Sequence, residues 1–331
     1  MEIPELFSPL LTTFQNDDPE AFDQALKANL DVLHQHSETG DTLLLILCHL
    51  FTHELALPPK WGSPTQLEMI RKLCALGADP NAENAAKWKP LHVAAMTGQI
   101  ALAEILIHAG SNLNGKLMGD PFGSPLALAL FYAQTHVAKT IAQPPTPNNL
   151  RHAAGLGQPI DLFFQTDGSL VPSAITGLSF YRPFDFFPEW QRTYSRQEVV
   201  DEALTWAARN NQVGSMAELI DRGAELNNNV YRGTPLLWAV YGDRVEAAAW
   251  LLDHGADPDL RHDFGGSEHG KSAVALHLAA QFNGVKCLRL LLERGADPTI
   301  RDAAFNGTPL DWAEFGQAHE AVEILRKAAQ N

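Results

Sequence analysis

Apolar runs that contain small residues alternate with polar, glycine-ended runs along the C-terminal third of the chain. Residues 233–240 read GTPLLWAV, and residues 250–258 read WLLDHGADP. The same pair of runs returns as ALHLAA with LLLERGADP and as GTPLDWA with IL, at 275–280, 290–298, 307–313 and 324–325. Threonine caps the free amides at a helix start, proline is tolerated at the first helical position, and glycine suits a left-handed helix end. The pattern predicts pairs of short helices, one beginning at Thr-Pro and the next ending before glycine.

These runs resemble the ankyrin repeat, whose signature is Thr-Pro-Leu-x-x-Ala followed by Leu-Leu-x-x-Gly-Ala-Asp. The resemblance implies an all-α fold, a solenoid of stacked helix pairs joined by short hairpin-like loops. It also implies recognition of another protein without catalysis, through a concave face built from hairpin tips and inner helices. Such proteins choose partners through variable positions, so the resemblance does not name the partner.

Weaker copies extend the resemblance over nearly the whole chain, to about eight units of which five are clear. We expect a single array over 1–331, with an N-terminal cap at 4–34 and a first block at 37–165 whose last unit is worn. A second block at 197–331 ends in a C-terminal cap. The segment 166–196 interrupts the array as an insertion.

One register position supports this division into units. The residue two before the second small residue of each inner helix is always apolar, at Ile46, Val93, Leu128, Trp206, Trp238, Leu278 and Trp312. Three tryptophans in this row could form a binding stripe, but a row of buried helix contacts explains an unbroken apolar register better. We predict that all seven side chains belong to the core.

The charge balance narrows the class of partner. The chain of 331 residues has 24 Lys and Arg against 39 Asp and Glu, a formal net charge of −15. Such a surface repels nucleic-acid phosphates and anionic lipid, because binding to both depends on Lys and Arg. A basic protein fits it better, although the acidity could also serve only to keep the array soluble.

The cysteines and the apolar runs indicate a compartment. Three cysteines far apart in the sequence argue against a disulfide framework and for a reducing environment. The first residues lack the basic and apolar regions of a secretory signal, and the run 43–48 is far shorter than a membrane span. We expect a cytoplasmic monomer without a membrane partner.

The insertion is rich in aromatic residues. Seven of the fifteen residues in 180–194 are aromatic, against 8% in the whole chain. This composition is too aromatic for disorder, and its two prolines prevent a regular helix. The rings either seal the junction between the worn unit and the second block, or form a binding ledge anchored by Arg182 and Arg192, and both can hold at once.

Histidine-rich places raise the question of a metal. The loop 262–269 offers two histidines and two carboxylates, and His49 and His53 lie one helical turn apart beside Glu54. Neither spacing matches a metal signature, so we expect a solvated Gly-rich loop and no metal or cofactor. His92 and His277 occupy the Leu-His position of the resemblance, which implies hydrogen bonds between neighbouring loops.

The chain shows no catalytic motif, and we assign no catalytic residue. A competing hypothesis is a small-molecule or metal-dependent enzyme whose pocket lies between the repeat groove and the insertion. It would use His152, Arg182, Asp185 or the loop 262–269, with Arg151 beside His152. Fold alone does not decide between binding and catalysis.

The predicted partner-binding residues follow from register and from the aromatic insertion. At the hairpin tips they are Trp88, Tyr231, Arg232, Phe264 and Phe305, and at the inner-helix exits they are Met96, Tyr241, Phe282 and Phe315. In the insertion they are Phe180, Tyr181, Arg182, Phe184, Phe187, Trp190 and Arg192. A sharper hypothesis, motivated by the net charge, is an acidic inhibitor or immunity-type protein that masks a basic partner.

Overall fold

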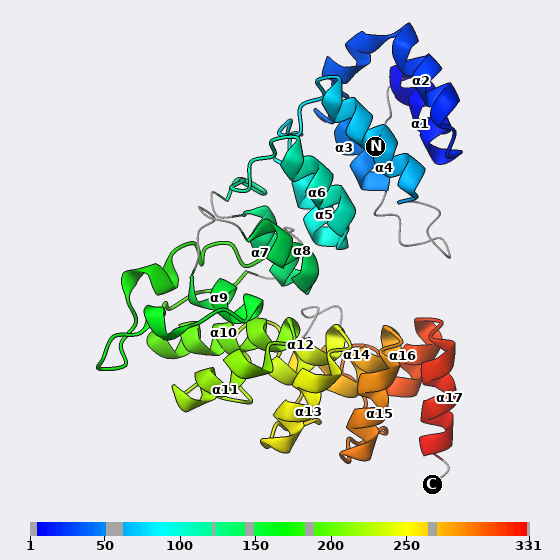
Figure 1. The fold of residues 1–331 in the computed structure, drawn as a ribbon. Coiled ribbons are helices and arrows are strands. Elements are labelled where there is room, and N and C mark those ends of the chain that lie inside the picture. Colours follow the sequence, from blue (N-terminus) through cyan, green and yellow to red (C-terminus); the bar gives the residue numbers. More distant parts are fainter. Residues whose placement is uncertain are drawn as a thin grey trace. The chain divides into compact units, whose positions relative to one another are not determined.

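The computed structural model describes residues 5–50, 62–120, 123–142, 149–182, 189–263 and 270–329. The chain forms two compact units (Figure 1). Unit 1 comprises Met1–Pro147 with Ser179–Pro183, and unit 2 comprises Asn148–Leu178 with Phe184–Asn331. No helix in the described part of the chain combines the length and apolarity that crossing a membrane requires.

Unit 1 is built from helix pairs. The helix pair expected at the N-terminus is present as α1 and α2, followed by a short 3-10 turn. In order, the elements are η1 (Glu5–Phe7), α1 (Ser8–Gln15), α2 (Pro19–Ala28), η2 (Leu30–His34), α3 (Leu43–Leu50), α4 (Pro64–Ala75), α5 (Pro90–Thr97), α6 (Ile100–His108), α7 (Pro125–Phe131) and α8 (Thr135–Ile141).

Unit 2 continues the same arrangement after one incomplete repeat. Two 3-10 turns follow its first helix in place of an outer helix, and the next inner helix is longer than the others. The elements are α9 (Leu150–Leu156), η3 (Asp161–Phe163), η4 (Pro172–Ile175), α10 (Arg196–Arg209), α11 (Val213–Asp221), α12 (Pro235–Tyr241), α13 (Val245–Asp253), β1 (His262–Asp263), β2 (Lys271–Ala273), α14 (Ala275–Gln281), α15 (Val285–Glu293), α16 (Pro309–Phe315) and α17 (His319–Ala328).

The division between the units differs from the predicted blocks. Unit 2 begins at Asn148 and therefore contains α9, which the sequence pattern placed at the end of the first block. The reason is packing, since α9 lies against α10 and against η4. The segment 166–196 is likewise shared, because Ser179–Pro183 belong to unit 1 and the rest of it to unit 2.

The inner helices begin where the sequence predicts. The hydroxyls of Thr234 and Thr308 accept from the backbone N–H groups of Leu237 and Asp311, three residues on. In both helices proline follows the cap, at a position whose missing N–H would have had no helical partner. These caps fix the start of each inner helix and hence the register of its buried face.

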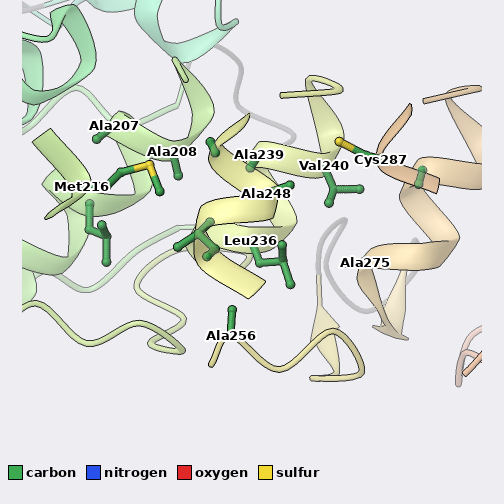
Figure 2. Close-up of a cluster of buried hydrophobic side chains, with 14 of the residues drawn as sticks. Ala207, Ala208, Met216, Leu236, Ala239, Val240, Ala248, Ala256, Ala275 and Cys287 are labelled. Atoms are coloured by element: carbon green, nitrogen blue, oxygen red, sulfur yellow. The ribbon is translucent and has the colours of Figure 1, made fainter. Parts of the chain in front are cut away.

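The register row is buried, as predicted. All seven of its side chains, from Ile46 to Trp312, are at most 6% exposed. Small residues that directly follow the row belong to the same buried core, and Figure 2 shows Ala207, Ala208 and Ala239 there together with Ala248 of α13. The core of unit 2 therefore runs through successive repeats and has no single centre.

Hydrogen bonds also join each repeat to the next. In the turns between inner and outer helices, the side-chain oxygens of Asn211, Asp243 and Asn283 accept from a backbone N–H in the outer helix of the next repeat. All three residues have a positive φ. We call these contacts the turn clasps; their donors are the N–H groups of Ala247, Cys287 and Ala321.

One small sheet departs from the helical pattern. Strands β1 and β2 pair antiparallel, with His262 opposite Ala273, and together they flank residues 264–269, which are outside the described part of the chain. The solvated loop expected at 262–269 is thus a hairpin at its described ends. His262 is buried there, contrary to that expectation.

Candidate partner-binding face

The described part of the insertion is tied down at both ends. At its start, Phe180 is buried within unit 1, where the hydroxyl of the neighbouring Ser179 donates to Asp120 at 3.1 Å. Tyr181 is half-buried, and the guanidinium of Arg182 lies 5.8 Å from its ring centre. Buried Phe180 has no surface to offer a partner, and we remove it from the partner-binding set.

The far end of the insertion forms a stack in unit 2. The Trp190 ring lies parallel to Tyr231 with 5.4 Å between ring centres, and the guanidinium of Arg192 lies 3.9 Å from the Trp190 ring centre. The side chain of Arg192 is only 4% exposed and forms ion pairs with Glu202 and Glu198 on α10. Trp190 and Arg192 therefore anchor the returning chain to the next repeat. Phe184 and Phe187 lie outside the described residues.

A buried ion-pair cluster continues this anchor. Arg151 on α9 donates to Glu202 at 2.7 Å and also to the carbonyl oxygen of Gly177 in the insertion, at 3.1 Å. One carboxylate thus holds Arg151 and Arg192, which belong to different segments. Because a buried ion pair compensates its own desolvation only when both partners are present, this cluster ties the insertion to α9 and α10.

Arg151 and His152, which the competing enzyme hypothesis would use, both lie beside Trp206. The guanidinium of Arg151 lies 4.5 Å from the ring centre of Trp206, and the His152 ring lies 5.8 Å from the same indole. Both side chains are buried. Both side chains therefore pack against α10.

Arginine covers a second register tryptophan one repeat later. Arg209 ends α10, and its guanidinium lies 3.5 Å from the ring centre of Trp238 on α12. Tyr241, at the end of α12, makes edge contacts with Trp238 at 5.7 Å and with Phe282 at 5.0 Å. Two predicted exit residues, Tyr241 and Phe282, therefore meet across neighbouring repeats, and Phe282 remains 48% exposed.

The remaining aromatic candidates of unit 2 surround a pocket. It has a volume of about 490 Å³ and is lined by the end of α14, the hairpin tip of the last repeat and α16. Its aromatic walls include Phe305 and Phe315, which are 64% and 80% exposed. Its other lining residues include Gln281, Arg301, Asp311 and Trp312. Pockets of this size with apolar walls and a few polar groups are typical of binding sites.

Other predicted tip and exit residues do not share this surface. Trp88 is buried, with its ring 6.1 Å from that of His49 and 6.2 Å from that of His92, so we also remove it from the partner-binding set. Met96 and Arg232 are half-buried. Phe264 lies outside the described residues.

His92 and His277 each join two neighbouring loops. The Nδ1 atoms of His92 and His277 accept from a backbone N–H, and their Nε2 atoms donate to the carbonyl oxygens of Gly123 and Gly307, each at 3.1 Å. These are the bonds between neighbouring loops that the resemblance implies. Burial lowers the pKa of both imidazoles, that of His92 to about 4.

No group of three or more potential metal-ligating side chains occurs among the residues that the structure describes. Burial lowers the pKa of His262 to about 4, and its Nδ1 has no hydrogen-bond partner in that range. His53 and Glu54, the predicted companions of His49, lie outside it.

Sequence reasoning missed the polar lining of the pocket and the cluster around Glu202. One sequence feature could have indicated the pocket: Gln281 ends its inner helix at the position that Arg209 occupies two inner helices earlier. No periodic signal links Arg151 or Arg192 to Glu202.

Family comparison agrees with the repeat geometry. A model of three ankyrin repeats matches residues 191–262, and a single ankyrin repeat model matches residues 87–116 and 273–303. The chain therefore contains ankyrin repeats over these residues. Ankyrin repeats imply a module for protein–protein interaction, and the mostly helical stack agrees with that architecture.

Curated relatives are similar to part of this ankyrin chain. A mitochondrial disaggregase from Bos taurus is 30% identical over 156 residues, which cover 38% of this chain and 22% of that protein. Protein PhlB from Serratia liquefaciens is 37% identical over 95 residues, 29% of this chain and 39% of that protein. An ankyrin repeat, SAM and basic leucine zipper domain-containing protein from Loxodonta africana is 31% identical over 110 residues, 33% and 22% of the two chains. The chain thus spans well under half the length of each.

Proposed function

We propose that this ankyrin-repeat protein binds a protein partner through the inner-helix face of unit 2, at its C-terminal repeats. The observation that carries the proposal is the exposure of Phe315 and Phe305, the most exposed large apolar side chains among the described residues. Exposed aromatic side chains around a pocket mark interaction sites, because their burial supplies most of the binding free energy. Phe282, which contacts Tyr241, is a further exposed aromatic side chain at an inner-helix exit of this unit.

The test is affinity capture from the native cell with matched variants. We expect the double variant Phe305→Ala/Phe315→Ala to lose its partner by about tenfold or more, since each aromatic hot spot contributes about 2 kcal/mol. Leu162→Ala is the control, because Leu162 is 60% exposed but lies in η3, away from this pocket. Equal capture by all three proteins would refute the proposal.

The net charge supports a finer proposal, in which the protein is an acidic inhibitor that masks a basic partner. Charge steering speeds the encounter of oppositely charged proteins and is screened over about 8–10 Å at 0.1–0.15 M salt. We expect the association rate constant to fall as salt rises while the dissociation rate changes little. A salt-independent association rate would contradict a basic partner and leave the apolar site in place.

The three cysteines support a reducing compartment, and we propose that the protein acts as a cytoplasmic monomer. All three are free thiols, two of them buried. Sedimentation at micromolar concentration tests the monomer, and localisation of the tagged protein tests the compartment.

A further inference from the structure

Two tryptophans on the inner helices of unit 2 are each covered by an arginine side chain. Arg151 on α9 covers Trp206 on α10, and Arg209 on α10 covers Trp238 on α12. In both cases the cation comes from the preceding inner helix and lies over the indole of the next one. A guanidinium over an indole is held by the ring's negative face, and the contact strengthens when water is excluded.

The last repeat pair has the tryptophan but a neutral residue in place of the cation. Trp312 on α16 occupies the register of Trp238, and Gln281 ends α14 as Arg209 ends α10. The 490 Å³ pocket is lined by both residues. The pocket therefore lies where Arg209 places a guanidinium in an earlier repeat, although Arg151 stands near the start of its helix and Tyr241 ends the helix between them.

The chemistry of the pocket suits a cation with an apolar stem. Phe305 and Phe315 present aromatic surface, and the Nε1–H of Trp312 donates to the buried carboxylate of Asp302 at 3.0 Å. A carboxylate that accepts from the indole increases the electron density of the ring, which strengthens its attraction for a cation. The buried Oε1 of Gln281 has no hydrogen-bond donor among the described residues and can accept one.

The cation already at the rim does not occupy this role. Arg301 donates to the carbonyl oxygen of Asn306 at 2.6 Å, lies 3.9 Å from Asp311, and has a side chain that is 55% exposed. Together Arg301 and Asp311 form a rim pair without net charge. The net charge of the whole chain, −15, still favours a basic ligand.

We propose that the pocket beside Trp312, whose side chain is 6% exposed in the free chain, receives an arginine side chain of the protein partner at the position that Arg209 fills beside Trp238. Its aliphatic stem packs between Phe305 and Phe315, and its guanidinium lies against the indole with a donor toward Gln281. Arginine fits better than lysine, because a planar, weakly hydrated guanidinium stacks on rings. This inference rests on the proposed function and names the anchor residue of the partner.

The test uses two small probes of nearly equal shape, one with a charged guanidinium and one with a neutral ureido group. N-acetyl-arginine methylamide and its neutral isostere N-acetyl-citrulline methylamide are titrated into the full chain, and the indole N–H signal of Trp312 is followed by NMR, assigned with Trp312→Phe. We expect the arginine probe to shift this signal and to bind at least about fivefold more tightly than the citrulline probe. Equal affinities, or a Trp312 signal that neither probe moves, would overturn the proposal.

A second pair of variants tests the repeat analogy directly. Gln281→Arg should place the chain's own guanidinium over Trp312 and weaken binding of the arginine probe by about fivefold or more, whereas Gln281→Met should still bind it. Undiminished binding by Gln281→Arg would contradict the inference. If Phe305→Ala/Phe315→Ala loses the protein partner while the arginine probe fails, the proposed function stands and the arginine anchor falls.

Discussion

His277 on α14 donates from its Nε2 to the carbonyl oxygen of Gly307 in the next repeat, across 3.1 Å. Its Nδ1 accepts from the backbone N–H of Val274, so the neutral ring is held at both nitrogens. His92 repeats the arrangement with Lys89 and Gly123. A proton added to either ring would remove an acceptor and leave a charge in the core.

This geometry predicts acid sensitivity. Burial lowers the pKa of His92 to about 4, from 6.5 in the unfolded chain, so its stabilising contribution is complete above pH 6.5 and is lost as the pH falls toward 4. Between pH 7 and pH 5 we expect the free energy of unfolding to fall by about 2 kcal/mol for this histidine. Denaturant unfolding of wild type and His92→Gln measures the difference. Exposed His108→Gln should keep the wild-type slope, and an equal slope in all three proteins would exclude this account.

Asp259 occupies a position at which two other repeats have asparagine, and this difference predicts a stabilising substitution. Asn81 and Asn227 each accept a backbone N–H from the next repeat and donate from Nδ2 to a glycine carbonyl oxygen. Asp259 accepts the N–H of Asp297 in the same way but has no donor to give, and burial raises its pKa. Asp259→Asn should increase the free energy of unfolding at pH 7 by about 1 kcal/mol. A lower melting temperature would show that the carboxylate has another role.

Replacement of Glu202 by a neutral residue should lower the free energy of unfolding of unit 2 more than most substitutions. It is the shared partner of Arg151 and Arg192, so Glu202→Gln removes the counter-charge of Arg151 and leaves Arg192 with Glu198 alone. We expect unit 2 to lose about 3–5 kcal/mol of unfolding free energy. Glu218→Gln, at an exposed site on α11, should change it by less than about 0.5 kcal/mol. A loss below about 1 kcal/mol for Glu202→Gln would mean that the cluster is not held as described.

Trp190 separates the structural role of the insertion from a binding role. Because it is stacked between Arg192 and Tyr231, Trp190→Ala should lower the free energy of unfolding by about 1–3 kcal/mol and expose 189–195 to protease. Partner affinity per folded molecule should stay constant. The opposite result, an unchanged melting temperature with a tenfold loss of affinity, would make Trp190 a binding hot spot.

Local periodicity was enough to predict the repeats, the helix starts at Thr234 and Thr308 and the buried register row. These features depend on residues within one repeat. The placement of Trp88 failed because its register suggests a tip, while burial depends on the rings of His49 and His92 from two different helices.

The anchor of the insertion and the pocket could not be predicted from local periodicity either, because their residues come from different segments of the chain. Arg151 and Glu202 are 51 residues apart, and no spacing rule connects them. Gln281 is an ordinary polar helix end until the contact between Arg209 and Trp238 is known. Phe305 and Phe315, in contrast, were selected by register, one as a hairpin tip and one as an inner-helix exit, and both are exposed.

The turn clasps bear on how such an array can change over evolution. Each clasp joins a turn to the outer helix of the next repeat alone, so duplication or deletion of one whole repeat preserves the clasps between all other pairs of repeats. The clasps lie at the turn end of the repeat, and the hairpin β1–β2 lies between Asp243 and Cys287 without breaking their bond. New segments can therefore arise at the hairpin tips, next to the binding face, while the framework that carries them is inherited unchanged.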